Sequence, residues 1–94
     1  MIAQINSILQ ALFRAQFGFD TQSITPLPQG GSDRRYFRLK AKDISVIGAY
    51  NPDINENKTF FYLTNHFISK GFPVPEPVSI CKDKKANLLS DLGD

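Results

Sequence analysis

The sequence predicts an α+β fold, in which an antiparallel sheet of about five strands carries one covering helix and an added N-terminal helix. Two separate segments have apolar residues at helical spacing, and short strand-like runs bounded by polar, proline or glycine turns lie between and after them. Ninety-four residues, 41% of them hydrophobic, suffice for one domain or one lobe of a larger domain and argue against disorder.

The first segment is expected to form an amphipathic helix over residues 3–17. Its apolar residues recur three or four positions apart: Ile5, Ile8, Leu9, Leu12, Phe13 and Phe17. Gly18 suits the position after the helix, because glycine adopts a positive φ without a Cβ clash.

Three strands are expected next. The run "QSITPLP" has strand character, but Pro26 and Pro28 cannot donate ladder hydrogen bonds, so it should lie at an edge of the sheet. In "YFRLKA", Phe37 and Leu39 face one way and the residues between them face the other. A short polar turn then joins this run to the apolar strand "ISVIGAY", and the two form a hairpin.

A second helix is expected after Pro52, with Asp53 or Asn55 as its N-cap, and Gly71 ends it. This helix should bury a broad aromatic face against the sheet. The face consists of a stripe and the residues that widen it: Phe60, Phe61, Leu63, Thr64, Phe67 and Ile68.

The proline-rich "FPVPEP" reads as an extended connector, and the residues after it suggest a second hairpin. Its strands are "VSIC" and "LLSDL", with "KDKKAN" as the turn. Because "NLLSDLGD" ends as a buried strand ends, residues 1–94 are expected to be a single N-terminal lobe cut before a C-terminal lobe.

Composition excludes several classes of protein. Eleven basic and nine acidic residues leave a net charge of +2, too small to imply a nucleic-acid or membrane partner. The lone Cys81 excludes an internal disulfide framework, and Cys and His are too few for a zinc site. The N-terminal residues lack the pattern of a signal peptide or membrane span, and a cytoplasmic location is expected.

The segment "GGSDRR" has the composition of an anion-binding turn. Backbone N–H groups of Gly30, Gly31 and Ser32 can approach an anion without Cβ obstruction, and Arg34 and Arg35 add charge for phosphate oxygens. An ordinary glycine-rich hairpin turn is the alternative, and spacing alone does not decide between them.

The assembly of segments resembles the N-terminal lobe of the aminoglycoside-phosphotransferase and choline-kinase superfamily. It looks most similar to bacterial sugar kinases that phosphorylate N-acetylmuramate and related amino sugars at the anomeric hydroxyl. The segments that carry the resemblance are "GGSDRRYFRL", "AYNPDINEN", "GFPVPEP" and "LLSDLGD".

The resemblance implies a protein-kinase-like N-lobe that binds ATP with Mg²⁺. Gly30, Gly31, Ser32 and Asp33 match the nucleotide-phosphate loop, with Arg34 and Arg35 at its exit, and Ser90, Asp91 and Leu92 match the inter-lobe hinge that reads adenine. The expected partners are the chain's own C-terminal lobe, the nucleotide and a small-molecule acceptor. Self-association is a further expectation, through the apolar surface that the C-terminal lobe would otherwise cover.

The sequence departs from the broader kinase pattern in two ways. "SVIGAYNP" has no lysine where the resemblance would place one, at Gly48, Ala49 or Tyr50, so either Arg35, Arg38 or Lys40 substitutes for it or the contact with phosphate is weaker. Glu56 is then better explained as a helix-start residue. The catalytic and metal-binding Asp segments belong to the family's C-terminal lobe, so no catalytic or metal-ligating residue is assigned here.

The remaining candidates have simpler explanations. His66 is expected at the surface, Cys81 as a small core residue, and residues 82–85 as a solvated turn.

Two other functions stay open. One is a stand-alone interaction module, which would have a closed core. The other is a nucleic-acid-binding domain, disfavoured because Tyr36 and Phe37 are adjacent and face opposite ways.

Overall fold

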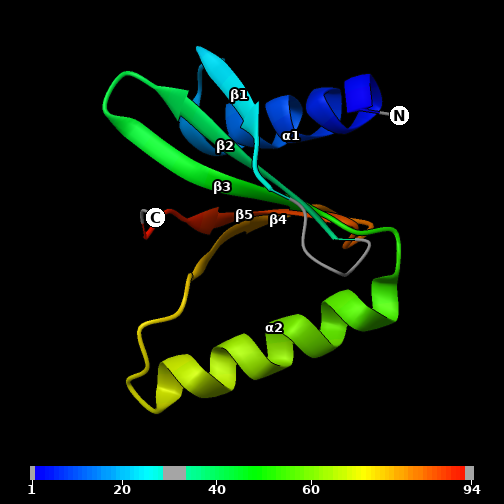
Figure 1. Ribbon diagram of the computed structural model, residues 1–94, viewed down its shortest axis with the longest axis vertical. Coiled ribbons are helices and arrows are strands. Elements are labelled where there is room, and N and C mark those ends of the chain that lie inside the picture. Colours follow the sequence, from blue (N-terminus) through cyan, green and yellow to red (C-terminus); the bar gives the residue numbers. More distant parts are fainter. Residues whose placement is uncertain (1, 29–33, 93–94) are drawn as a thin grey trace.

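The computed structural model describes residues 2–28 and 34–92. The order of elements predicted from the sequence, α-β-β-β-α-β-β, is confirmed (Figure 1). The elements are α1 (Ile2–Phe17), β1 (Ser23–Pro26), β2 (Arg35–Ala41), β3 (Ile44–Tyr50), α2 (Ile54–Ser69), β4 (Pro77–Ile80) and β5 (Ala86–Ser90).

The strands form one antiparallel sheet with the order β1-β2-β3-β5-β4. β1, which ends at Pro26, lies at an edge as its prolines predicted. β2 and β3 form the predicted hairpin, in which Ala41 pairs with Ile44 and Lys42 takes a positive φ of 57° in the turn. The described residues therefore form an α+β fold, with one five-stranded antiparallel sheet and two helices.

α1 covers one face of the sheet and forms the core with it. Ile5, Leu9 and Phe13 of α1 are fully buried. The buried apolar residues that the sheet contributes to this cluster are Phe37, Leu39, Ala41, Val46, Ala86 and Leu88. The alternation of β2 explains the choice of face, because Phe37 and Leu39 point toward α1 while Tyr36 and Arg38 point the other way.

The prediction that the second helix buries a broad aromatic face against the sheet is wrong. α2 lies apart from the sheet on the side opposite α1 (Figure 1), and its buried residues are Asn57 and Thr64. Leu63 and Phe67 are 45% and 41% exposed. The physical reason is that α1 already occupies the face of the sheet that forms the core, and the side chains that α2 buries are the polar Asn57 and Thr64. The covering helix is α1.

The ends of α2 follow the predicted signals. Asp53 is the N-cap and its carboxylate accepts a hydrogen bond from the Glu56 amide at 3.0 Å, which decides against Asn55. Gly71 follows the helix with φ of 81°.

The second hairpin differs in its bounds from the sequence prediction. β5 begins at Ala86, so the turn is shorter than "KDKKAN", and Cys81 follows β4, packed partly buried against the core. In the described part of the chain, no helix is long and apolar enough to cross a membrane.

Candidate functional site: a pocket between helix α2 and the sheet

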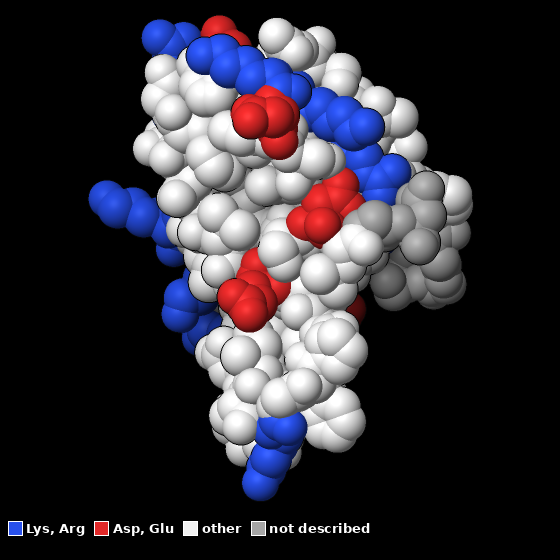
Figure 2. Space-filling view, turned by 90° about the vertical axis from the view of Figure 1, so that its left-hand side faces the viewer, with Lys and Arg blue, Asp and Glu red and all other residues white. Residues whose placement is uncertain are grey.

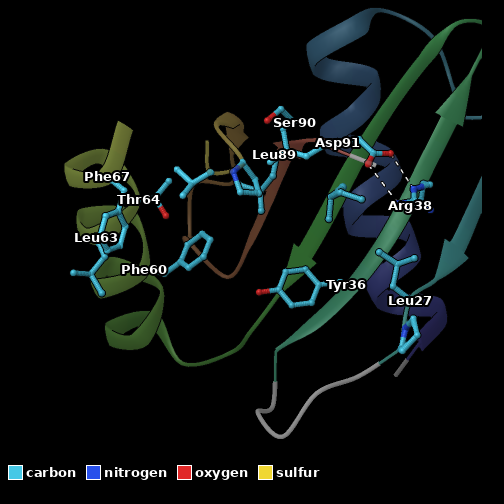
Figure 3. A pocket seen from close by; sticks show the side chains of 15 residues that line it. Leu27, Tyr36, Arg38, Phe60, Leu63, Thr64, Phe67, Leu89, Ser90 and Asp91 are labelled. Atoms are coloured by element: carbon cyan, nitrogen blue, oxygen red, sulfur yellow. Dashed lines mark hydrogen bonds and ion pairs between the residues drawn. The ribbon is translucent and has the colours of Figure 1, made fainter. Parts of the chain in front are cut away.

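The space between α2 and the sheet contains a pocket of about 620 Å³ (Figure 3). This volume lies within the range of about 300–1,000 Å³ that is usual for small-molecule sites. The residues that line it come from the segment after β1, the strands β2, β3 and β5, the residues after β5, the helix α2 and the connector before β4: Leu27, Pro28, Tyr36, Arg38, Ile47, Phe60, Leu63, Thr64, Phe67, Val74, Pro75, Leu89, Ser90, Asp91 and Leu92.

The walls of the pocket are mainly aliphatic and aromatic. On the sheet side, Tyr36 of β2 points toward α2, and Phe60 points from α2 toward the sheet (Figure 3). Ile47 of β3 and Leu89 of β5 are cross-strand partners and so present their side chains to the same face. Such a surface suits a flat apolar or heteroaromatic group.

An ion pair holds the polar end of the pocket. Arg38 Nε donates to Asp91 Oδ2 at 2.9 Å, and the Ser45 hydroxyl donates to the same oxygen at 2.6 Å. A longer bond of 3.4 Å joins Arg38 Nη2 to Asp91 Oδ1, so the guanidinium meets the carboxylate through two nitrogens (Figure 3). The two side chains are 21% and 9% exposed. Together, Arg38 and Ser45 fix the segment that follows β5 to the strands β2 and β3.

The connector before β4 is fixed to the same end of β5. The Ser90 amide donates to the Glu76 carbonyl, and the Glu76 amide donates to the Ser90 hydroxyl, both at 2.8 Å. Residues 90–92 therefore have a defined path along the rim of the pocket.

A second polar cluster lies at the start of α2. The Arg34 side chain is buried, donates from Nη2 to Asn57 Oδ1 at 2.9 Å, and lies 4.2 Å from the centre of the Phe60 ring. Asn57 Nδ2 in turn donates to the carbonyls of Asn51 at 2.8 Å and Lys84 at 2.7 Å. The cluster joins the residue before β2, the first turn of α2 and the β4–β5 turn.

Of the predicted site residues, Arg38, Ser90, Asp91 and Leu92 come together at the pocket. Gly30, Gly31, Ser32 and Asp33 lie outside the described residues, although Leu27 and Pro28, which precede them, line the pocket.

The two arginines at the loop exit have different places. Arg34 is buried against α2, and Arg35 is half-buried at the start of β2, paired in register with Tyr50.

The structure also places the residues at which the resemblance would have put a strand-three lysine. Gly48 points toward α1, whereas Ala49 is the register partner of Tyr36 and so shares the face of the pocket. Arg38 is directed to Asp91, and Lys40 is exposed. Arg34, by contrast, contacts α2 at Asn57 and Phe60.

Sequence reasoning missed most of the pocket wall, including Tyr36, Ile47 and Leu89. A signal existed, because these residues alternate with the core residues of the same strands. The prediction that the second helix packs its aromatic face against the sheet left no room for a pocket there.

The other candidates behave as expected. His66 is exposed beside the Phe67 ring. Residues 82–84 of the turn are exposed. The backbone amide of Lys85, which follows them, donates a hydrogen bond to Asp83 and holds the pKa of that carboxyl below its usual value. Within residues 2–28 and 34–92, no group of three His, Cys, Asp or Glu side chains is placed to hold a metal ion.

No protein-family model matches the chain, and no curated protein matches it. What the chain does is therefore inferred from the fold and from the pocket.

Proposed function

We propose that this chain is the nucleotide-binding lobe of an ATP-dependent small-molecule phosphotransferase. The adenine ring would occupy the pocket between α2 and the sheet, and the segment Gly30–Asp33 would lie over the phosphates. Arg34 and Arg35, which follow that segment, supply positive charge near it.

One observation carries the proposal. The pocket is bordered on one side by Leu27 and Pro28, which lead into the glycine segment, and on another by Ser90, Asp91 and Leu92, which leave β5. These are the two segments that the resemblance assigned to the phosphates and to adenine. They are about sixty residues apart in the sequence, and the fold of the antiparallel sheet brings them to the same pocket.

The chemistry of the pocket suits adenine. Ile47 and Leu89 offer apolar surface to one face of a flat ring, and Phe60 faces them from α2. Affinity for this lobe alone should be weak, because in two-lobed kinases the second lobe completes the binding site.

The stand-alone interaction module is less well supported. That alternative predicted a closed core, yet several large apolar side chains are exposed on or near α2 and the end of β5: Ile54, Tyr62, Leu63, Phe67, Phe72 and Leu92. A lobe that normally packs against a second lobe would expose such surface.

A nucleic-acid-binding function is also less well supported. Phe37 is buried under α1 with 2% exposure, so Tyr36 alone of this pair could stack on a base. On the face shown in Figure 2, Lys and Arg side chains form a band across the upper part, acidic side chains lie below it, and uncharged surface covers most of the remainder.

In the whole protein, a C-terminal lobe would supply the general base and the Mg²⁺ ligands, and this lobe would position the γ-phosphate. A sugar or amino-sugar hydroxyl is the acceptor that the resemblance suggests. A reducing, ATP-containing cytoplasm is the proposed location, consistent with the single free Cys81.

Nuclear magnetic resonance titration of the ¹⁵N-labelled chain with Mg-ATP tests the proposal. We expect amide shifts concentrated at Ile47, Leu89 and Leu92, with smaller shifts for inorganic triphosphate, which has no ring. Ile47→Arg should abolish the localised shifts because it places a charge against the adenine site. Ile80→Arg, at a 44% exposed position on β4, is the matched control and should leave them intact.

Shifts that are scattered over the surface, or that inorganic triphosphate reproduces in full, would refute an adenine site in the pocket. Activity is tested separately, by ATP-dependent phosphorylation of amino sugars by the protein in which this lobe is joined to a catalytic lobe.

A further inference from the structure

The position of α2 needs a physical explanation, because no core lies beneath the helix. Its apolar stripe borders the pocket, and the buried residues of α2 are the polar Asn57 and Thr64. A helix without a packed apolar face is held mainly by contacts at its ends.

The C-terminal end of α2 is held through the connector. The Phe72 amide donates to the Phe67 carbonyl at 3.0 Å, and the two rings meet edge to face at 5.7 Å. Val74 and Pro75 of the connector then line the pocket before the chain joins β4. These contacts are local in sequence and link α2 to the sheet only through the connector.

The N-terminal end is held by buried polar groups from four segments. Asn51, between β3 and α2, is 1% exposed, and its backbone N–H donates to the Lys85 carbonyl at 2.8 Å. Asn57 is 5% exposed and bonds with its amide nitrogen to the carbonyls of Asn51 and Lys84. The oxygen of the same side chain accepts from Arg34. Asn57 thus uses both ends of its amide to bind three segments.

We infer that Arg34 is a positioning residue: through Asn57 and Phe60 it holds the first turns of α2 at a fixed distance from the sheet and so keeps the pocket open. Arg34 is suited to this because one planar guanidinium can donate to an amide oxygen and lie over an aromatic ring at the same time. Phe60 is itself a wall of the pocket, so displacement of Arg34 changes both the position of the helix and the shape of the cavity. The inference does not depend on which ligand enters the pocket.

Hydrogen exchange of the ligand-free chain, read amide by amide, tests the inference. Arg34→Met removes the donor and the stacking cation while keeping much of the aliphatic stem. We expect the amides of α2 to lose protection by roughly tenfold, the size of one hydrogen bond from a charged donor. The amides of β2, β3 and β5 should keep theirs, because their core lies under α1.

Controls and conservative variants separate positioning from general stability. Lys58→Met removes the same charge from an exposed position on α2 and should leave exchange unchanged. Arg34→Lys keeps the charge without the planar fork and should restore protection in part. Asn57→Asp keeps the acceptor for Arg34 but loses both carbonyl contacts, and should also lower the protection of α2.

A second readout measures the position of the helix. Spin labels at Tyr62→Cys on α2 and Ser23→Cys on β1, with Cys81→Ser, give the distance distribution between two exposed sites on either side of the pocket. Arg34→Met should shift or broaden this distribution, and Lys58→Met should not.

Two results would overturn the inference: an equal loss of protection in α2 and in the sheet, or an unchanged distance distribution in Arg34→Met.

Discussion

Gly48 provides a direct test of how α1 packs on the sheet. The residue lies in the middle of β3 on the face toward α1. A Cβ added there would lie 2.9 Å from Leu39 Cδ1 and 3.0 Å from both terminal methyl groups of Leu9. Methyl groups can often move aside, but Leu9 and Leu39 are each 0% exposed. Gly48→Ala therefore overfills a closed interface.

Two opposing effects set the magnitude of the change. Overpacking in a closed core costs about 1–3 kcal/mol. Replacement of glycine by alanine restricts the unfolded chain and thereby raises the free energy of unfolding by about 0.4–1 kcal/mol. The net loss expected for Gly48→Ala is about 1–2 kcal/mol, which lowers Tm by roughly 4–8 °C per kcal/mol in a domain of this size.

Urea unfolding followed by circular dichroism measures this loss. Ser23→Ala, at an exposed position of the edge strand β1, is the control and should change stability by no more than about 0.5 kcal/mol. If Gly48→Ala raised stability, only the effect on the unfolded chain would remain. That result would show that Leu9 does not pack against β3 and would refute the assignment of this face as the core.

Three further substitutions test local contacts. Asp53→Ala removes the N-cap of α2 and should cost about 1 kcal/mol, visible as faster hydrogen exchange in the first turn of the helix. Arg38→Lys cannot keep the two-nitrogen contact with Asp91 and should broaden or shift the Asp91 amide signal in nuclear magnetic resonance spectra; unchanged spectra would contradict the contact. The hydrogen bond from the Lys85 amide lowers the pKa of Asp83 in the folded chain. The ionised Asp83 carboxylate therefore stabilises the fold at any pH above the ordinary pKa of an aspartate. This small contribution is lost as the pH falls through the lowered pKa. Asp83→Asn keeps an acceptor without the charge, so the difference between its unfolding midpoint and that of the parent should shrink as pH falls below the ordinary pKa of an aspartate, about 4; a constant difference would contradict this.

Most of the sheet could be predicted because its strands carry local signals. Alternation placed Phe37 and Leu39 on one face, and prolines placed β1 at an edge. The position of α2 could not be predicted in this way. Its stripe at Phe60, Leu63 and Phe67 has the period of a packed helix, and period alone does not say whether the stripe meets a sheet or borders a cavity.

The candidate site was predictable only in part, for a related reason. Ser90, Asp91 and Leu92 were proposed because their segment resembles the inter-lobe hinge of the kinase family, and all three line the pocket. The use of Arg38 was not predictable, because its partner Asp91 lies fifty-three residues away in the sequence. Asn57 was missed because an asparagine in a helix has no distinctive signal until its partners are known.

The division of the sheet into two unlike faces bears most directly on function. α1 closes one face with an apolar core, while the other face remains open toward α2 and presents the half-buried Tyr36 and Ile47. A domain that only needed to be stable would gain by closing this second face, because apolar surface left in water forgoes about 25 cal/mol per Å². The described residues instead hold α2 away with a buried polar cluster that includes Arg34 and Asn57, groups that are expensive to desolvate. Such an arrangement is understandable if the open face binds a ligand. The titration with Mg-ATP tests whether that ligand is a nucleotide, and the hydrogen-exchange experiment tests whether Arg34 keeps the pocket open.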